Sequence, residues 1–256
     1  MSNLRHSPSA HEDRPTALLV GHQEWQIRGQ AGDGARLVAA LVGDDAARAM
    51  PVAERDRLLG AVYRDIFGPR ILASRACIEC AKPYDFDFQI ADLEAKLDQQ
   101  PPPPEIKRMS EDGHAVLDTG HRLRALTLQD EQAVAGLSVD DAEDALFDAC
   151  VETPEGAPPL SRDTAERVLE WLSPITDLDL VGTCPECGTS QTTRFSIEHY
   201  VVQALGAERR QLVREVHMIA ASYGWSQSEI LGLARDDRRQ LATLVEADRR
   251  GTVGWW

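Results

Sequence analysis

Two short cysteine pairs, Cys77-Ile78-Glu79-Cys80 and Cys184-Pro185-Glu186-Cys187, decide how this sequence folds. Each pair has the C-x-x-C spacing with which one tight turn directs two thiolates at one metal ion, and a structural zinc site needs four such ligands in a tetrahedron. One pair supplies half of a site, and two pairs supply a closed one. The sequence therefore predicts one structural Zn²⁺ per chain, held by Cys77, Cys80, Cys184 and Cys187.

Other interpretations of these cysteines stay open. A single C-x-x-C pair also occurs as a redox motif, and the four residues would equally suit two disulfides or four separate buried thiols. Nothing in the sequence indicates secretion, and cytosolic thiols stay reduced, so zinc is the preferred interpretation. The fifth cysteine of the chain, Cys150, ends an apolar helical stripe and is expected to be a small core residue.

The segments beside each cysteine pair have the pattern of short strands. Residues 84–88 alternate aromatic and acidic side chains, which is the period of a half-buried strand. Residues 178–181 and 192–195 flank the second pair in the same way. We therefore expect each pair to lie at the turn of an antiparallel hairpin. Gly188 supplies the positive φ that such a turn needs, whereas Ala81 in the matching position predicts a first turn that is less ideal or differently shaped.

The segment between the two pairs is predicted to be a largely helical insertion. Thr127, Ser138 and Ser161 are each placed to cap the N-terminus of a helix. Residues 114–126 also contain a predicted hairpin, with Asp118-Thr119-Gly120 as its turn.

Helical patterns also precede and follow the cysteine pairs. Pro51 suits the first turn of a helix with an apolar stripe over residues 58–67. Residues 196–223 predict a long helix, which Gly224 is placed to end. Residues 226–229, Ser-Gln-Ser-Glu, then form a capping box, with Trp225 and Ile230 placed as its hydrophobic staple.

The predicted fold class is α+β and mainly helical, with two C-x-x-C hairpins that form one zinc-ribbon-like site, a helical insertion and a C-terminal helical region. The predicted parts are a disordered N-terminus at residues 1–15, helices with the first cysteine pair at 16–100, the insertion at 101–176, and the second pair with the C-terminal helices at 177–256.

Composition limits the classes of partner. The formal charge is −15, with 42 acidic and 27 basic residues, which argues against a surface that binds nucleic acid. No apolar run approaches the length of about 20 residues that a membrane span needs. The first residues are polar and have no apolar core of a signal peptide. We therefore expect a protein that is cytoplasmic when made and does not bind membranes.

The sequence gives little support to an enzyme. It contains no nucleophile elbow, zinc-protease motif, phosphate loop or dinucleotide-binding fingerprint. A zinc ion held by four cysteines has no open position for catalysis. His114 and His121 are alternative metal ligands, but the four cysteines already complete a site.

Several segments of the sequence resemble a known protein family. They are a helix like residues 58–67, the first C-x-x-C with its acidic-aromatic strand, the stretch His-Arg-Leu-Arg-Ala-Leu-Thr at 121–127, and Cys-Pro-x-Cys-Gly at 184–188. The most specific part is Glu-Val-His at 215–217, Tyr-Gly-Trp-Ser at 223–226 and Glu-Ile-Leu at 229–231. Together they resemble the zinc-knuckle baseplate proteins encoded with the contractile tails of phages and of phage-derived injection systems. The resemblance covers roughly residues 50–248, and it departs at Ala81, where glycine is usual, and before Thr127, where proline is usual.

The resemblance implies a non-enzymatic structural or assembly component of a baseplate, with other tail proteins as partners and incorporation into a phage-like particle left open. A cytoplasmic assembly chaperone or adaptor that is absent from the finished particle is the first alternative, and a zinc-ribbon regulator of transcription is the second. Trp225, Trp255 and Trp256 are the residues expected to bind a partner.

Overall fold

The computed structural model describes residues 21–30 and 32–251, and contacts divide the chain into two compact units. The first unit is Val42–Ile197, and the second joins the described parts of Ala10–Leu41 and Glu198–Trp256. This division differs from the four consecutive parts that the sequence predicts. The helices before residue 42 pack with the C-terminal helices, and such a pairing of distant segments leaves no local pattern. The predicted disordered segment, residues 1–15, lies outside the described residues.

The described chain is a mixture of helix and sheet, which confirms the α+β class. The helices of the first unit are α3 (Asp44–Ala49), α4 (Val52–Phe67), α5 (Ile90–Asp98), α6 (Leu128–Val134), α7 (Val139–Cys150) and α8 (Arg162–Leu172). Its strands are β1 (Arg70–Ala76), β2 (Pro83–Gln89), β3 (Ile106–Met109), β4 (Ala115–Leu117), β5 (Arg122–Leu123), β6 (Val151–Glu152), β7 (Asp177–Thr183) and β8 (Ser190–Ser196).

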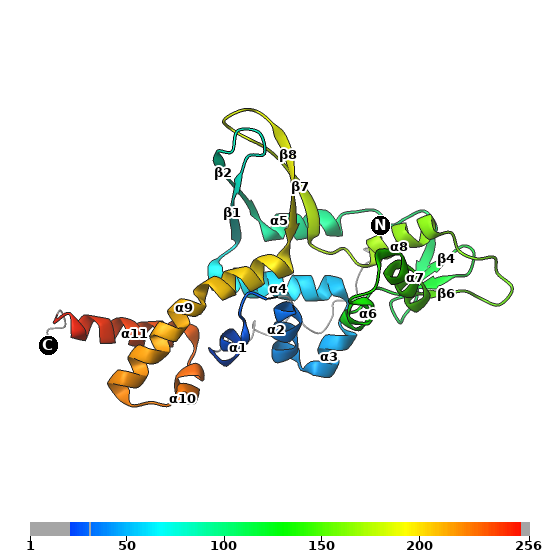
Figure 1. Cartoon of the computed structure of the whole chain (residues 1–256). Coiled ribbons are helices and arrows are strands. Elements are labelled where there is room, and N and C mark those ends of the chain that lie inside the picture. Colours follow the sequence, from blue (N-terminus) through cyan, green and yellow to red (C-terminus); the bar gives the residue numbers. More distant parts are fainter. Residues whose placement is uncertain (1–20, 31, 252–256) are drawn as a thin grey trace. The chain divides into compact units, whose positions relative to one another are not determined.

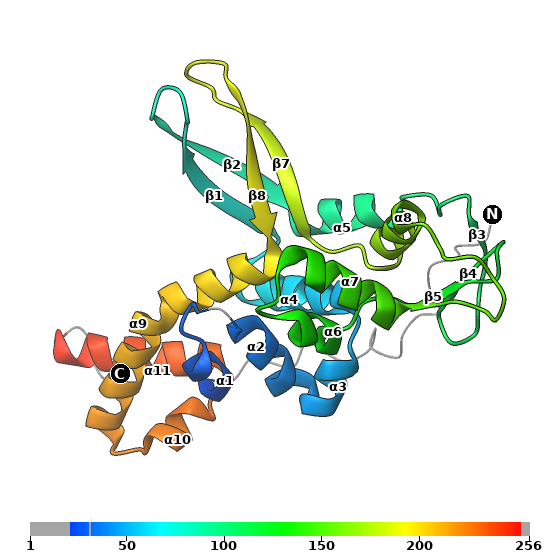
Figure 2. The ribbon, with the colours of Figure 1, turned by 45° about the vertical axis from the view of Figure 1, so that its right-hand side comes forward.

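Two antiparallel pairs of strands carry the cysteines. Strand β1 pairs with β2 from Arg70 opposite Gln89 to Ala76 opposite Pro83, and β7 pairs with β8 in the same way. Figure 2 shows these two ribbons side by side. The ring of Phe88 on β2 meets the ring of Phe195 on β8 edge to face, with 5.0 Å between centroids. Aromatic pairs of this geometry stabilise the packing of the elements that carry them.

A buried carboxylate fixes the chain where it enters β7. Asp56, on α4, accepts hydrogen bonds from the backbone N–H of Thr176 at 2.7 Å and from its hydroxyl at 3.0 Å. Arg55 donates to the other oxygen of Asp56 at 2.8 Å, so the buried charge has a partner. Because Thr176 directly precedes β7, this contact sets the position of the second cysteine strand pair.

The segment between the cysteine pairs is less helical than the sequence predicts. It contains an antiparallel sheet of four short strands in the order β3-β4-β5-β6, besides α6, α7 and α8. The predicted hairpin is confirmed, since Ala115 pairs with Leu123 and Gly120 turns at a φ of 88°. Strands β3 and β6 were missed because runs of four and two residues are too short to show a period.

This sheet and α8 enclose the apolar core of the insertion. Ala165 and Val168 of α8 pack on Ala115, Leu117 and Leu123 of the sheet, and all five are almost fully buried. Helix α8 therefore packs on the sheet through these two residues.

The predicted N-caps of the insertion are all present. The side chains of Thr127, Ser138 and Ser161 accept from the backbone N–H three residues further on, at the starts of α6, α7 and α8. At α6 the contact is reciprocal, because Asp130 accepts from the backbone N–H of Thr127 at 2.9 Å. Each such cap satisfies a backbone donor that the helix leaves free.

The second unit is helical throughout its described part. Its helices are α1 (Gly21–Gln26), α2 (Asp33–Val42), α9 (Ile197–Tyr223), α10 (Gln227–Leu231) and α11 (Arg235–Arg249), of which α2 ends and α9 begins with a residue of the first unit. Figure 1 shows α10 and α11 following the end of α9. Met218 and Ile219 of α9 pack with Ile230, Ala242 and Val245, and this cluster is the core between the three helices.

The corner between α9 and α10 forms as predicted, except for the staple. Gly224 ends α9 at a φ of 70°, and Ser226 and Glu229 make the reciprocal contacts of a capping box. Ile230 is fully buried, whereas Trp225 is 39% exposed and its ring lies 5.5 Å from that of Tyr223. The aromatic partner of Trp225 thus comes from α9, because Ile230 already packs into the helical core. Trp255 and Trp256 lie outside the described residues.

No helix in the described part of the chain combines the length and the apolar character needed to cross a membrane.

Candidate metal centre

The four paired cysteines meet at one point of the first unit. The sulfur atoms of Cys77, Cys80, Cys184 and Cys187 all lie within 4.8 Å of one another. The Sγ atoms of Cys77 and Cys187 are 3.6 Å apart, and those of Cys80 and Cys184 are 3.8 Å apart. Each of these short distances joins one cysteine turn to the other, so both turns contribute equally to the cluster.

These distances fit one metal ion with four thiolate ligands. A tetrahedral ion with metal–sulfur bonds of about 2.3 Å places its ligand sulfurs about 3.8 Å apart. A disulfide would require about 2.05 Å, and all five cysteines of the chain are free. The structure therefore brings the four cysteines close enough together to hold one metal ion, and they do not form disulfides.

The two cysteine turns repeat the same backbone contacts. The N–H of Ala81 donates to the carbonyl of Cys77 at 3.0 Å, and the N–H of Gly188 donates to that of Cys184 at 2.9 Å. The φ angle of Ala81 is 58° and that of Gly188 is 76°. Ala81 is the one residue other than glycine with a positive φ in the described chain. Of the two alternatives expected for the first turn, a different shape is wrong, because Ala81 adopts the left-handed conformation of its glycine counterpart, whereas a less ideal turn agrees with the strain of that conformation for an alanine.

The first cysteine of each pair is buried and the second is more accessible. Cys77 and Cys184 are almost fully buried, Cys80 is half-buried and Cys187 is exposed. The hydroxyl of Thr189, 3.4 Å from the sulfur, and the backbone N–H of the same residue lower the pKa of Cys187 to about 6. Thiolates are the metal-binding form of cysteine, so this turn favours binding at neutral pH.

The matching thiol of the first turn behaves differently. The backbone N–H of Lys82 lowers the pKa of Cys80, but burial and the other three thiols outweigh it and raise the pKa to about 11. A metal ion replaces the protons of such a cluster when it binds.

A buried glutamine that sequence reasoning missed holds the first turn. The side-chain oxygen of Gln191, on β8, accepts from the backbone N–H of Ile78 at 3.2 Å. Its amide nitrogen donates to the hydroxyl of Tyr84 at 2.6 Å. The sequence does contain a signal for this role. Gln191 and Phe195 are four residues apart, so they lie on the same face of the strand, and that face is buried. Gln191 is thus a positioning residue for the turn that carries Cys77 and Cys80.

The alternative ligands and the fifth cysteine do not join this cluster. The four cysteines are the one group of three or more metal-ligating side chains found in the described part of the chain. His121 is buried at the turn after β4, where its Nδ1 lies 2.7 Å from the hydroxyl of Thr119. Cys150 is 1% exposed and burial raises its pKa to about 11, which confirms the prediction of a core residue.

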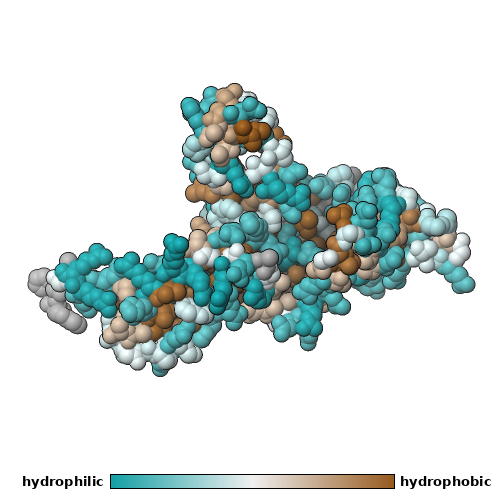
Figure 3. All heavy atoms as spheres, viewed as in Figure 1, coloured by the Kyte–Doolittle hydropathy of each residue, from teal (hydrophilic) through white to brown (hydrophobic). Residues whose placement is uncertain are grey.

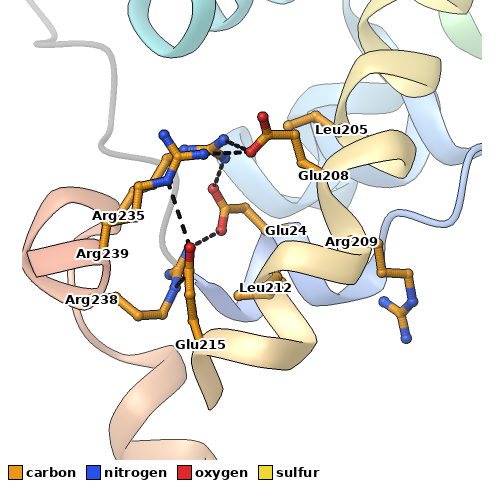
Figure 4. Close-up of a pocket in the computed structure, with 9 residues that line it drawn as sticks. All are labelled: Glu24, Leu205, Glu208, Arg209, Leu212, Glu215, Arg235, Arg238 and Arg239. Carbon is orange, nitrogen blue, oxygen red and sulfur yellow. Dashed lines mark hydrogen bonds and ion pairs between the residues drawn. The ribbon is translucent and has the colours of Figure 1, made fainter. Parts of the chain in front are cut away.

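A second cluster of titratable side chains lies in the second unit. Arg238 is 1% exposed, and it donates to Glu215 at 2.8 Å and to Glu24 at 2.5 Å. Figure 4 shows this cluster of Glu24, Glu208, Glu215, Arg235, Arg238 and Arg239, with Arg209 pointing away from it. Three carboxylates face three guanidinium groups, so the formal charges cancel and α1 is tied to α9 and α11.

Comparisons with protein families, with curated proteins and with solved structures find no match for this chain.

Proposed function

We propose that this protein is a non-enzymatic structural or assembly component, stabilised by one zinc ion, of the baseplate of a phage-like contractile tail or injection system. The observation that carries the zinc part of the proposal is the convergence of four cysteine sulfurs from two separate strand pairs. Each strand pair has only two strands, and isolated two-stranded ribbons are marginally stable in water. A shared metal ion would hold both ribbons together.

Zinc is favoured over other metals by the ligands and by their setting. Four thiolates in a tetrahedral arrangement suit zinc or iron, and two C-x-x-C turns are typical of structural zinc sites. Four protein ligands leave no position for water or substrate. The proposed role of the ion is therefore mechanical.

The baseplate part of the proposal rests on the sequence resemblance. The segments that carry it include residues 215–217 and 223–231, which lie in α9, at the corner after it and in α10. The exposed rings of Tyr223 and Trp225 stand at this corner and are suited to contact another tail protein, since aromatic side chains often dominate interfaces. Trp255 and Trp256 remain proposed partner-binding residues.

The experiment compares particles from a strain that lacks the gene with particles from strains that express variants. We expect electron microscopy to show incomplete baseplates without the protein, and restored ones with the wild-type chain. Tyr223→Ser combined with Trp225→Ser should fail to restore assembly while the purified variant keeps its metal. Mass spectrometry of washed particles then distinguishes a resident component from an assembly chaperone.

Point substitutions are preferred to a deletion of the C-terminal helices, and they have a matched control. Deleting residues 226–251 would be a poor variant, because Ile230, Ala242 and Val245 belong to the core on α9. Val213→Ser, at an exposed apolar position of α9 away from the corner, is the matched control. Normal contractile tails in the absence of the protein would overturn the proposed role.

A further inference from the structure

The first unit contains a large groove that the proposed metal centre does not use. It has a volume of about 700 Å³ and lies between α7, α8 and the segment that leads into β7. Its apolar floor includes Leu146 and Phe147 of α7, Leu169 of α8 and Leu178 of β7. Figure 3 shows hydrophobic side chains exposed among hydrophilic ones in this unit. A volume of this size is within the range of sites that bind ligands or anchor side chains.

Helix α7 is poorly covered for an amphipathic helix. Of its residues Val139–Cys150, only Cys150 is buried within the described structure. Leu146 and Phe147 are half-buried, and both line the groove. A surface helix normally buries a continuous apolar stripe against its neighbours. The guanidinium of Arg162 lies over the ring of Phe147, 4.2 Å from its centroid, so Leu146 is the residue of this apolar face that lacks cover.

The rim of the groove is acidic, and part of its charge is unbalanced. Glu143, Glu166 and Glu170 have no ion pair in the described part of the chain, and all three are exposed. Glu166 and Glu170 are four residues apart on α8, where like charges destabilise a helix. Glu131 and Asp177, also on the rim, are already paired with Arg55 and Arg194. The three unpaired carboxylates give the rim a negative field beside an apolar floor.

We propose that this groove binds an amphipathic α-helix of a partner protein, with large apolar side chains toward the floor and lysine or arginine beside them. A helix that lays its apolar face into a groove is a recurrent mode of recognition. Charge complementarity selects the basic partner, because cations would neutralise Glu143, Glu166 and Glu170 together. The chain's formal charge of −15 adds a longer-range attraction for the same partner. The inference goes beyond the proposed baseplate role and does not depend on it. The groove is also separate from the metal centre, since none of the four cysteines lines it.

The test uses synthetic helical peptides of about four turns, roughly 16 residues, and the full-length protein as purified. The first peptide has leucines at helical i, i+3, i+4 and i+7 spacing, with lysines beside them. The second replaces the lysines with glutamates, and the third has the composition of the first in scrambled order. Isothermal titration calorimetry should give saturable binding of the lysine peptide, about tenfold or more tighter than either of the others. Its affinity should fall as salt is added, because the rim charges are exposed.

Variants of the protein, each with a matched control, show whether the peptide binds in the groove. Leu146→Asp should abolish binding of the lysine peptide, whereas Val139→Asp should leave it unchanged, since Val139 is 74% exposed on the same helix and outside the groove. Glu166→Gln with Glu170→Gln should weaken binding about threefold, because two exposed ion pairs with the peptide are lost. Glu111→Gln with Glu155→Gln, which changes the net charge equally at exposed positions elsewhere, should not. Circular dichroism and thermal unfolding of each variant show that it is folded.

Three results would overturn the inference. The first is no saturable binding of the lysine peptide, and the second is equal binding of the scrambled or glutamate peptide. The third is a concentration-dependent dimer in sedimentation velocity that Leu146→Asp abolishes and the lysine peptide does not displace, which would assign the groove to a second copy of the chain.

Discussion

Ala81 and Gly188 hold the same left-handed backbone conformation at equivalent positions of the two cysteine turns, with φ angles of 58° and 76°. Each donates its N–H to the carbonyl of the first cysteine of its pair. Glycine adopts this conformation without strain, whereas a residue with a Cβ atom pays about 1–2 kcal/mol. The two turns are therefore similar in shape and different in stability.

The first prediction exchanges the residues at these two positions. Ala81→Gly should raise the free energy of unfolding by about 0.5–1 kcal/mol, because relief of strain exceeds the added entropy of the unfolded chain. Gly188→Ala should lower it by about 0.5–1 kcal/mol, since nothing crowds the position and the backbone strain is only partly offset by the lower entropy of the unfolded chain. Urea denaturation at a fixed free zinc concentration measures both. A loss of stability in Ala81→Gly would contradict the equivalence of the turns.

The second prediction concerns the pH dependence of thiol alkylation after a chelator has removed bound metal. The thiolate is the reactive form, and Thr189 lowers the pKa of Cys187 to about 6. The alkylation rate of Cys187 should therefore rise as the pH increases through about 6. An ordinary cysteine, with a pKa of 9.0, would show this rise at higher pH. Cys150, buried and with a pKa of about 11, should react last.

Iodoacetamide labelling followed by peptide mass spectrometry measures both rates in one sample. Thr189→Val is the control, because it removes the hydroxyl and should shift the Cys187 profile to higher pH. The prediction is wrong if Cys187 reacts with a midpoint near 9 or if Cys150 is labelled first.

The third prediction tests the buried charges of the second unit. Glu215→Ala should reduce stability by about 3–5 kcal/mol, because it leaves Arg238 buried with half of its partners. Glu208→Ala should cost about 1 kcal/mol or less, since Glu208 is one-third exposed and screened by solvent. Hydrogen exchange of the α11 amides reports the stability of this unit by itself. Equal effects of the two variants would show that burial does not set the strength of these ion pairs.

The features that the sequence predicts best are those with a short, local signature. The four cysteines are found by their spacing, and Thr127, Ser138, Ser161 and Ser226 by their places before apolar helical patterns. A cap or a metal turn involves residues that are close in the chain, so a pattern of a few residues is sufficient to show it.

What the sequence does not show depends on distant partners. Gln191 looks like an ordinary polar strand residue until Ile78 and Tyr84 are placed beside it. Glu24 and Arg238 look like surface charges, because nothing local indicates that α1 packs on α9 and α11. Ala81 was expected to make its turn less ideal or differently shaped, and the turn keeps its shape because its hydrogen bonds outweigh the preference of a single alanine.

We propose that Cys77, Cys80, Cys184 and Cys187 hold one zinc ion in the folded protein. The most direct measurement is metal analysis of the protein purified in reducing buffer, combined with X-ray absorption spectroscopy at the zinc edge. We expect one zinc per chain with four sulfur ligands at about 2.3 Å, loss of that zinc in Cys184→Ser, and its retention in the matched control Cys150→Ser. Protein that is folded and metal-free, or a ligand shell that contains nitrogen or oxygen, would contradict it.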